Sequence, residues 1–460
     1  MSSPLPQTTT RSIDLPTIAT DLLPISDIPR QLTIRQKIAV LLSICVGITA
    51  FFTYHSYLHM IDITGKETVP SIIAAEQIRT GLARAHTQIA NLFLLKEAAD
   101  GPSGLAYVAA INQAHDDLLT VAQNITYGNE ERAPILAAMR QLSDYERLVG
   151  MALVSKESNG LILKADALMR ERLLPSVSML EQVNFRHLTT SYKDELRDAK
   201  TYFFAFLLFS VMLLVVMVET QIKLYSDFKR ILNPPLFLGM LMLLVGVFLM
   251  VVKVIALNAD LHTAKADAFD SVHSLTEAQS IAYSANAQES IYLLMHGHPS
   301  QGQQTNLFIA KVNQIFDTRI GVASALIAQP NVLKAHGFLG DELANITFPG
   351  EHQAIAESLK TWAEYVAIDT QIRRLESAGQ HEQAVALGVG KLEHQSDWAF
   401  DHFVQALTKA IKINQSAFDA AIKRATNALE IMKYLWLTLL FVPLVGSFIG
   451  IEHRLSEYRE

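Results

Sequence analysis

The sequence contains one cysteine in 460 residues, which excludes an intramolecular disulfide bond. Cys45 lies within a long apolar run, so any exported segment must be stabilised by packing and hydrogen bonding alone. Charged residues make up only 18 % of the chain, the formal net charge is −7, and no long basic stretch is present. We therefore expect no nucleic acid among the partners of this protein.

Common catalytic motifs are also missing. The sequence contains no glycine-rich phosphate loop, no nucleophile elbow and no pair of acidic residues within its apolar runs. We therefore expect that the protein is not an enzyme and that it binds no cofactor.

What the sequence does have is four long apolar runs, and half of its residues are hydrophobic. Each run is close to the ~20 residues that an α-helix needs to cross ~30 Å of hydrocarbon, and the central turns carry no acidic or basic residue. Core helices of soluble proteins are rarely this apolar on every face. The sequence predicts a multi-pass membrane protein with transmembrane helices at residues 36–58, 202–218, 235–257 and 434–452.

Basic residues in the short segments predict the orientation of the spans. They gather before the first span, between the second and third spans, and after the fourth: Arg30, Arg35, Lys37, Lys223, Lys229, Arg230, Arg454 and Arg459. By the positive-inside rule, we expect both termini in the cytoplasm and the protein in the cytoplasmic (inner) membrane of a bacterium. The remaining segments are then a disordered cytoplasmic tail (1–35), a cytoplasmic connector (219–234), a cytoplasmic stub (453–460) and two extracytoplasmic segments (59–201 and 258–433).

Both outer segments have a helical pattern. In the first, apolar residues follow the alternating four-three spacing of packed helices: Ile78, Leu82, Ala85, Ile89 and Leu92. Glycine-rich breaks divide this segment into helices near 60–99, 105–127, 130–157 and 161–200. The second segment repeats the plan, with breaks at 296–299, 330–350 and around 379. We predict an all-α fold with two extracytoplasmic up-down four-helix bundles.

The two halves predict an internal duplication in tandem. A shift of 199 residues places 91–95 (NLFLL) on 290–294 (SIYLL) and the first span on the third. Asn184 and Asn414 each interrupt an apolar seam shortly before the following span. We expect these two residues to fix helix register, with a ligand contact as the alternative. The two halves could pair as a pseudo-dimer, with a homo-oligomer as the alternative.

A span, a four-helix bundle and a second span in succession resemble the periplasmic sensory module of bacterial chemoreceptors and sensor kinases. Residues 379–387 (GQHEQAVAL) resemble the small-residue turn into the final helix of such modules, and Leu174, Pro175 and Leu180 resemble their fourth helix. The resemblance implies that a bundle binds a small ligand or a partner protein and shifts a transmembrane helix. Members of that family carry a cytoplasmic output domain. We expect none in this protein and therefore expect a separate effector.

Histidines are concentrated in the second outer segment. His296 and His298 lie in a predicted turn, and His394 and His402 are spaced along one helix. Imidazole groups are good metal ligands, but no metal-binding motif is present. We therefore expect solvated polar residues and no metal, and we keep these four histidines only as weak candidates for a metal site.

Gly446 and Gly450 predict the packing surface of the fourth span. Two glycines four residues apart allow the backbones of neighbouring transmembrane helices to approach closely. The centres of the spans carry no charge, which disfavours a transporter.

These observations predict a receptor-like membrane protein. It would sense an external small molecule or protein and signal through a separate cytoplasmic effector. The alternative is a structural or assembly subunit of a cell-envelope complex that binds no small ligand. The expected partners are the lipid bilayer together with the effector in the first case, or with an envelope-complex partner in the second.

Overall fold

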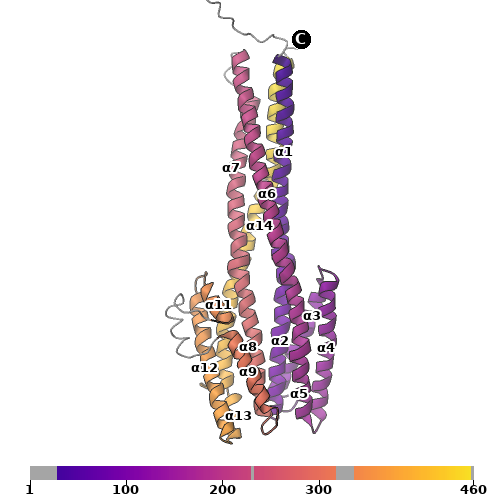
Figure 1. The fold of residues 1–460 in the computed structure, drawn as a ribbon, viewed down its shortest axis with the longest axis vertical. Coiled ribbons are helices and arrows are strands. Elements are labelled where there is room, and N and C mark those ends of the chain that lie inside the picture. The colour runs from indigo at the N-terminus through magenta and orange to yellow at the C-terminus, as the bar shows by residue number, and fades with distance from the viewer. Residues whose placement is uncertain (1–27, 229–232, 317–335, 457–460) are drawn as a thin grey trace, which may run out of the picture. The chain divides into compact units, whose positions relative to one another are not determined.

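The computed structural model describes residues 28–228, 233–316 and 336–456, and every regular element among them is helical (Figure 1). The elements in chain order are α1 (Ile28–Asp62), the π-helix η2 (Ile63–Glu67), α2 (Thr68–Leu94), α3 (Pro102–Gln123), α4 (Asn129–Val154), α5 (Ser158–Leu168), the π-helix η3 (Met169–Leu173), α6 (Leu174–Phe228), α7 (Pro234–His262), the π-helix η4 (Thr263–Phe269), α8 (Asp270–Leu294), α9 (Gln301–Ile315), α11 (Phe338–Ala344), α12 (Glu351–Ser377), α13 (His381–Gly388) and α14 (Ser396–Ser456). The predicted all-α class is confirmed.

Four helical stretches are long and apolar enough, by length and composition, to cross a membrane: Pro29–Leu94, Ser158–Ser226, Pro234–Leu294 and Ser396–Ser456. Each contains one of the four apolar runs and continues beyond it into an outer helix. The prediction of four long apolar helices is therefore confirmed, and these helices indicate a membrane protein. Lys229, Arg230 and Arg459, which entered the orientation argument, lie outside the described residues, as do residues 330–335 of the predicted break.

The helices divide into two compact units. The first comprises Met1–Thr49, Ala205–Val247 and Leu437–Glu460, and the second comprises Ala50–Phe204 and Phe248–Trp436. The first unit therefore holds one end of each long helix, and the second holds the outer helices. The candidate sites discussed below lie in the second unit.

In the first unit, Gly446 and Gly450 of α14 lie against α7. A Cβ atom added at Gly446 would lie 2.8 Å from the carbonyl oxygen of Pro235 and 3.1 Å from the Cα of Gly239. A Cβ added at Gly450 would lie 3.1 Å from the Cβ of Leu236. Any larger side chain at Gly446 would push the two helix backbones apart, because the nearest atoms belong to the main chain.

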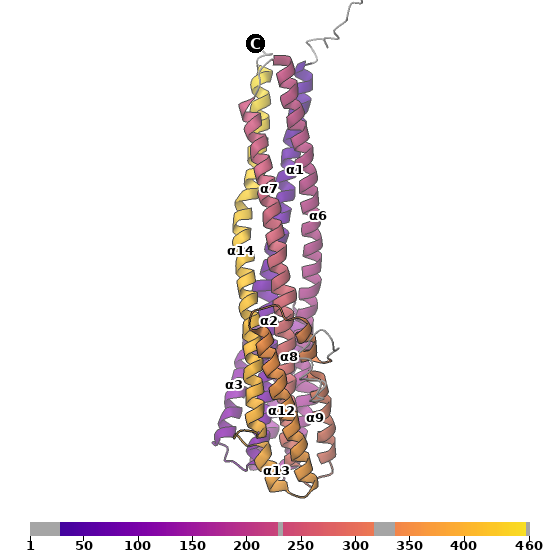
Figure 2. The same cartoon turned by 90° about the vertical axis from the view of Figure 1, so that its left-hand side faces the viewer.

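The second unit contains two large cores. The first core is enclosed by α2, α3, α4 and the continuous helix α5–η3–α6, and its centre includes Leu82, Leu142 and Leu173, all completely buried. The second core is enclosed by α8, α9, α11, α12, α13 and α14, several of which run alongside one another in Figure 2. It is more aromatic than the first, and its fully buried centre includes Trp362 and Tyr365.

Helices α2 and α8 lie side by side and join the two cores (Figure 1). Thr87 Oγ1 donates a hydrogen bond to the carbonyl oxygen of Tyr283 at 3.1 Å. A third, smaller core crosses the same contact, with Ile72 of α2 and Phe269 of η4 both buried. The halves are therefore packed on each other along their length within this unit.

Two turns at corresponding places in the halves have the same side-chain hydrogen bonds. Asn124 Nδ2 donates to Ser71 Oγ at 3.1 Å, and Asn345 Nδ2 donates to Ser271 Oγ at 2.9 Å. Each asparagine opens an Asn-Ile-Thr sequence and precedes a helix of its own half.

The glutamates that follow these turns also act alike. Glu131 Oε2 accepts hydrogen bonds from the backbone nitrogens of Thr126 and Tyr127 at 2.7 and 2.6 Å. Glu351 Oε2 accepts them from Thr347 and Phe348 at 2.7 and 2.9 Å. Both carboxylates are buried and lie in the first turn of a helix, where negative charge is favourable.

Candidate functional site

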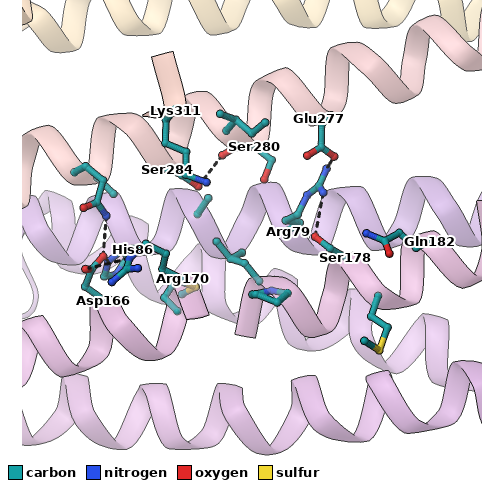
Figure 3. Close-up of a pocket in the computed structure, with 18 residues that line it drawn as sticks. Arg79, His86, Asp166, Arg170, Ser178, Gln182, Glu277, Ser280, Ser284 and Lys311 are labelled. Carbon is teal, nitrogen blue, oxygen red and sulfur yellow. Dashed lines mark hydrogen bonds and ion pairs between the residues drawn. The ribbon is translucent and has the colours of Figure 1, made fainter. Parts of the chain in front are cut away.

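A cavity of about 430 Å³ opens between the two halves in the second unit (Figure 3). Its walls come from α2, from α5–η3–α6, and from α8 and α9. The polar lining side chains are Arg79, His86, Asp166, Arg170, Ser178, Gln182, Glu277, Ser280, Ser284, Gln288 and Lys311. The apolar remainder is Ala83, Met169, Leu174, Pro175, Met179, Ile281 and Ala287.

The wall formed by η3 and the start of α6 has an irregular backbone. Pro175 has no N–H and cannot donate to the carbonyl of Glu171 four residues earlier. The π-helical segment Met169–Leu173 ends two residues before Pro175, and Met169 and Pro175 both line the cavity. π-helical turns occur often at functional sites because they displace side chains from the regular helix face.

Arg79 of α2 connects the two halves at one side of the cavity. Its Nη1 atom lies 3.0 Å from Glu181 Oε2 and donates to Ser178 Oγ at 3.2 Å, and both of these residues belong to α6. It also forms an ion pair with Glu277 of α8. The Arg79 side chain is only 7 % exposed, so its positive charge is stabilised by these partners rather than by water.

A second buried network lies at the other side. Asp166 Oδ1 accepts a hydrogen bond from Gln288 Nε2 at 2.7 Å and lies 3.2 Å from His86 Nε2. His86 Nδ1 is 3.1 Å from the hydroxyl of Tyr145. Burial alone would raise the pKa of Asp166, but its hydrogen bond with His86, the charge of that ring and the bond from Gln288 outweigh this and lower the pKa. Asp166 is therefore a carboxylate at neutral pH.

Lys311 of α9 is the cation of the cavity that has no carboxylate partner. Among the described residues, no acidic side chain lies within 4.0 Å of its Nζ atom. Burial lowers the pKa of Lys311; Glu277 opposes this shift, and the positive charges of Arg79 and Arg170 add to it. An anion placed in the cavity would relieve this repulsion.

The α2–α8 contact carries another buried cluster beside Arg79. His273 Nδ1 lies 2.5 Å from Glu76 Oε1 and 3.3 Å from Glu181 Oε1. Burial raises the pKa of Glu76 to about 7, against the opposing effects of His273 and Arg79 and with a further rise from Glu181. The His273 ring also stacks on Phe185, with centroids 4.9 Å apart. These ionisable groups therefore lie at the contact between the halves.

The structure places the four weak metal candidates at separate positions. His296 Nδ1 lies 2.7 Å from Glu376 Oε2, and His298 Nδ1 lies 2.7 Å from Ser300 Oγ. His394 Nδ1 lies 2.8 Å from Glu364 Oε1, and His402 Nδ1 donates to the carbonyl oxygen of Trp398 at 2.8 Å. These four described residues do not converge on one site, although the ring of His296 stacks on that of His381.

Asn184 and Asn414 do not line the cavity. Both are buried, and each donates from Nδ2 to the carbonyl four residues earlier, Leu180 at 3.1 Å and Ala410 at 3.2 Å. Asn414 also hydrogen-bonds to Glu351, the residue that holds the turn before α12. Their expected role in helix register stays a prediction.

None of the cavity residues was predicted from the sequence, although a signal was present. Beside the seam that contains Ile78, the residues Glu76, Arg79, Ala83, His86 and Ala90 form a second series with alternating three-four spacing, and all five are buried. A helix with two such series packs on two sides. This pattern predicts that α2 also packs against a helix outside the first core.

Comparison with known proteins supports a sensor module in the first half. Residues 61–193 match the model of a family described as the actinobacterial sensor domain. The match covers less than half of the chain and includes the α2 and α6 walls of the cavity but not those from α8 and α9. No curated protein and no solved structure gave a significant match.

Proposed function

We propose that this protein is a non-enzymatic membrane receptor that binds a small anionic molecule in the cavity between its halves and signals through a separate cytoplasmic effector. The observation that carries the proposal is the cavity itself, whose walls are formed in part by the sensor-like stretch 61–193. Its volume of about 430 Å³ is within the range of small-molecule sites. The cation at Lys311 favours a carboxylate or phosphate group in the ligand.

The walls of the cavity connect the ligand to the spans. A ligand that contacts Ser178 or Gln182 touches α6, which continues into the second apolar run. A ligand that contacts Lys311 and Ser284 touches α9 and α8, and α8 is continuous with the third run through η4 and α7. A ligand that binds one arrangement of these walls more tightly than another would therefore shift the second and third spans relative to each other.

The same proposal includes two extracytoplasmic four-helix bundles produced by duplication and paired as a pseudo-dimer in the inner membrane, with both termini cytoplasmic. The matching hydrogen bonds of Asn124 and Asn345 support the duplication. The α2–α8 contact supports the pairing. Parallel repeats pair about an axis along the membrane normal in other membrane proteins.

Binding of defined anions tests the function. The full-length protein in detergent would be titrated with inorganic phosphate, acetate, succinate and citrate while its thermal unfolding is followed. We expect at least one of these anions to raise the unfolding temperature. Lys311→Met should weaken the binding of that anion by about 10- to 100-fold, which corresponds to the loss of a charge-assisted hydrogen bond. Lys360→Met is the matched control, because the Lys360 side chain is 70 % exposed on α12 and does not line the cavity.

A structural subunit of an envelope complex is the second candidate. The continuous packing of α2 on α8 favours it, because such a contact makes the outer part rigid. If none of the four anions stabilises the protein and Lys311→Met behaves like Lys360→Met, the receptor proposal fails and the structural candidate is preferred.

A further inference from the structure

A cluster of two histidines and one glutamate lies in the second half, away from the cavity lining. His296 Nδ1 lies 2.7 Å from Glu376 Oε2, and His381 Nδ1 hydrogen-bonds to the other carboxylate oxygen, Oε1. The two imidazole rings are stacked, with centroids 4.1 Å apart. One donor atom from each of the three side chains lies within 4.8 Å of the others.

Two glycine turns bring these residues together from distant parts of the chain. Gly297 has φ +72° and follows His296 directly, just after the end of α8. Gly379 has φ +73° and lies two residues after the end of α12 and three residues after Glu376. The Gln380 backbone nitrogen then donates to the Leu375 carbonyl at 2.9 Å, so the chain turns sharply and α13 starts with His381.

The site is open at one side and fixed at the other. The side chain of Glu376 is only 3 % exposed, while those of His296 and His381 are 48 % and 31 % exposed. Gln301 Nε2 donates to Glu376 Oε2 at 3.3 Å and to the Tyr292 carbonyl at 3.3 Å, which holds the carboxylate in place. An ion could therefore enter from the solvent and meet a positioned carboxylate.

We propose that His296, Glu376 and His381 bind a divalent transition metal ion of the zinc class, with water completing its coordination. Two imidazole nitrogens and one carboxylate oxygen are the protein ligands of many zinc sites with an open position. Calcium and magnesium prefer oxygen ligands throughout, so they fit this donor set poorly. The proposal is independent of the anion-binding function, because it concerns different residues.

A second histidine–glutamate cluster in the same unit does not support the same inference. Glu76, Glu181 and His273 also have donor atoms within 4.8 Å of one another. However, Arg79 Nη1 lies 3.0 Å from Glu181 Oε2, so a permanent positive charge already neutralises that group. No cationic side chain of the described Lys and Arg residues forms an ion pair with Glu376.

Metal titration of the full-length protein tests the site. Protein without a polyhistidine tag would be purified in detergent, treated with EDTA, dialysed, and titrated with Zn²⁺ by calorimetry and with Co²⁺ by visible absorption. We expect one equivalent of each metal to bind. Glu376→Gln and His381→Ala should each weaken Zn²⁺ binding by at least about 10- to 100-fold. Gln301→Leu removes only the hydrogen bond that positions Glu376 and should weaken Zn²⁺ binding by about 10-fold.

His298→Ala and His394→Ala are matched controls, because both histidines are exposed and neither contacts Glu376. Circular dichroism would check that each variant is folded, and His296→Gln provides a second ligand variant should His381→Ala not fold. The absence of a stoichiometric Zn²⁺ site in the parent protein would overturn the proposal. So would equal affinity in Glu376→Gln and in the His298→Ala control.

Discussion

Ser290 Oγ donates a hydrogen bond to Asn91 Oδ1 at 2.6 Å, and these two buried residues are 199 positions apart. The same shift aligns the sequence of α2 with that of α8. When two copies of a unit pair about a two-fold axis, residues close to the axis contact their own counterparts. The axis of the proposed pseudo-dimer therefore passes close to Asn91 and Ser290.

A disulfide cross-link tests this axis. In a Cys45→Ser background, the pair Asn91→Cys and Ser290→Cys should form a bond within one chain under mild oxidation, because the parent side chains are in contact. Mass spectrometry of protease digests would identify the linked peptides. Each single-cysteine variant is a control for links between chains; if the double variant gives only such links, the pairing within one chain is wrong.

Loss of Arg79 should strongly destabilise the outer unit. Arg79→Met would leave Glu181 and Glu277 without their cation, and a buried carboxylate that loses its partner costs about 3–5 kcal/mol of the free energy of unfolding. Arg147→Met is the control, because the Arg147 side chain is 61 % exposed and its loss should cost no more than about 0.5 kcal/mol. Urea unfolding of both variants in detergent would measure the difference. Equal midpoints for the two would contradict the assigned role.

Stability should fall as the pH rises from 5 to 8. The pKa of Glu76 is raised from its usual 4.5 to about 7, so between these two pH values the folded state keeps a proton that the unfolded state has lost. The pKa of His273 is also raised: burial lowers it, but the hydrogen bond and charge of Glu76, with the charges of Glu181 and Glu277, outweigh that. Its stabilising effect is present below about pH 6.5 and is lost as the pH rises through the folded pKa.

The contribution of Glu76 can be isolated by substitution. The glutamine side chain of Glu76→Gln cannot titrate. Between pH 4.5 and 7, the free energy of unfolding of this variant should therefore decrease less than that of the parent, by a difference of about 2–4 kcal/mol. Asp144→Asn is the control, because the Asp144 side chain on α4 is 55 % exposed. Parallel pH profiles for the parent and Glu76→Gln would show that Glu76 is ionised in the folded protein.

Reporter fusions should place both outer segments outside the cytoplasm. Fusions after Gly128 and after Gly379 interrupt turns between helices, and the proposed orientation predicts activity from alkaline phosphatase at both. A fusion after Tyr225, at the end of α6, should be active only with a cytoplasmic reporter. Phosphatase activity in the fusion after Tyr225 would show that the orientation is the opposite of the one proposed.

The spans and most outer helices could be predicted from the sequence because their signals are local. The break at 100–104 predicts a helix near 105–127, and α3 occupies Pro102–Gln123 with the proline in its first turn. The sequence pattern predicts that the preceding helix extends to about residue 99, which is too far. The helix stops at Leu94, and Lys96 has a φ of +54°. A lysine rarely adopts a positive φ, so the sequence does not indicate this turn.

The cavity could not be predicted in this way because its residues come from both halves. Arg79 and Lys311 are more than 200 positions apart, and no local pattern determines which faces of α2 and α8 meet. The proposed duplication, in contrast, has a local signal in the sequence. Asn-Ile-Thr occurs at both 124–126 and 345–347, and its threonine and asparagine make equivalent bonds in both halves.

The π-helices η2 and η4 have a mechanical consequence for both halves. They occupy Ile63–Glu67 and Thr263–Phe269, between an apolar run and the outer helix that follows it. A π turn contains one residue more than an α turn, so its conversion to α-helix would rotate everything beyond it by about 100°. Each half therefore has, just outside its span, a point where the helix can change its winding. A span connected in this way can turn about its own axis with a shift of only about 1.5 Å along it.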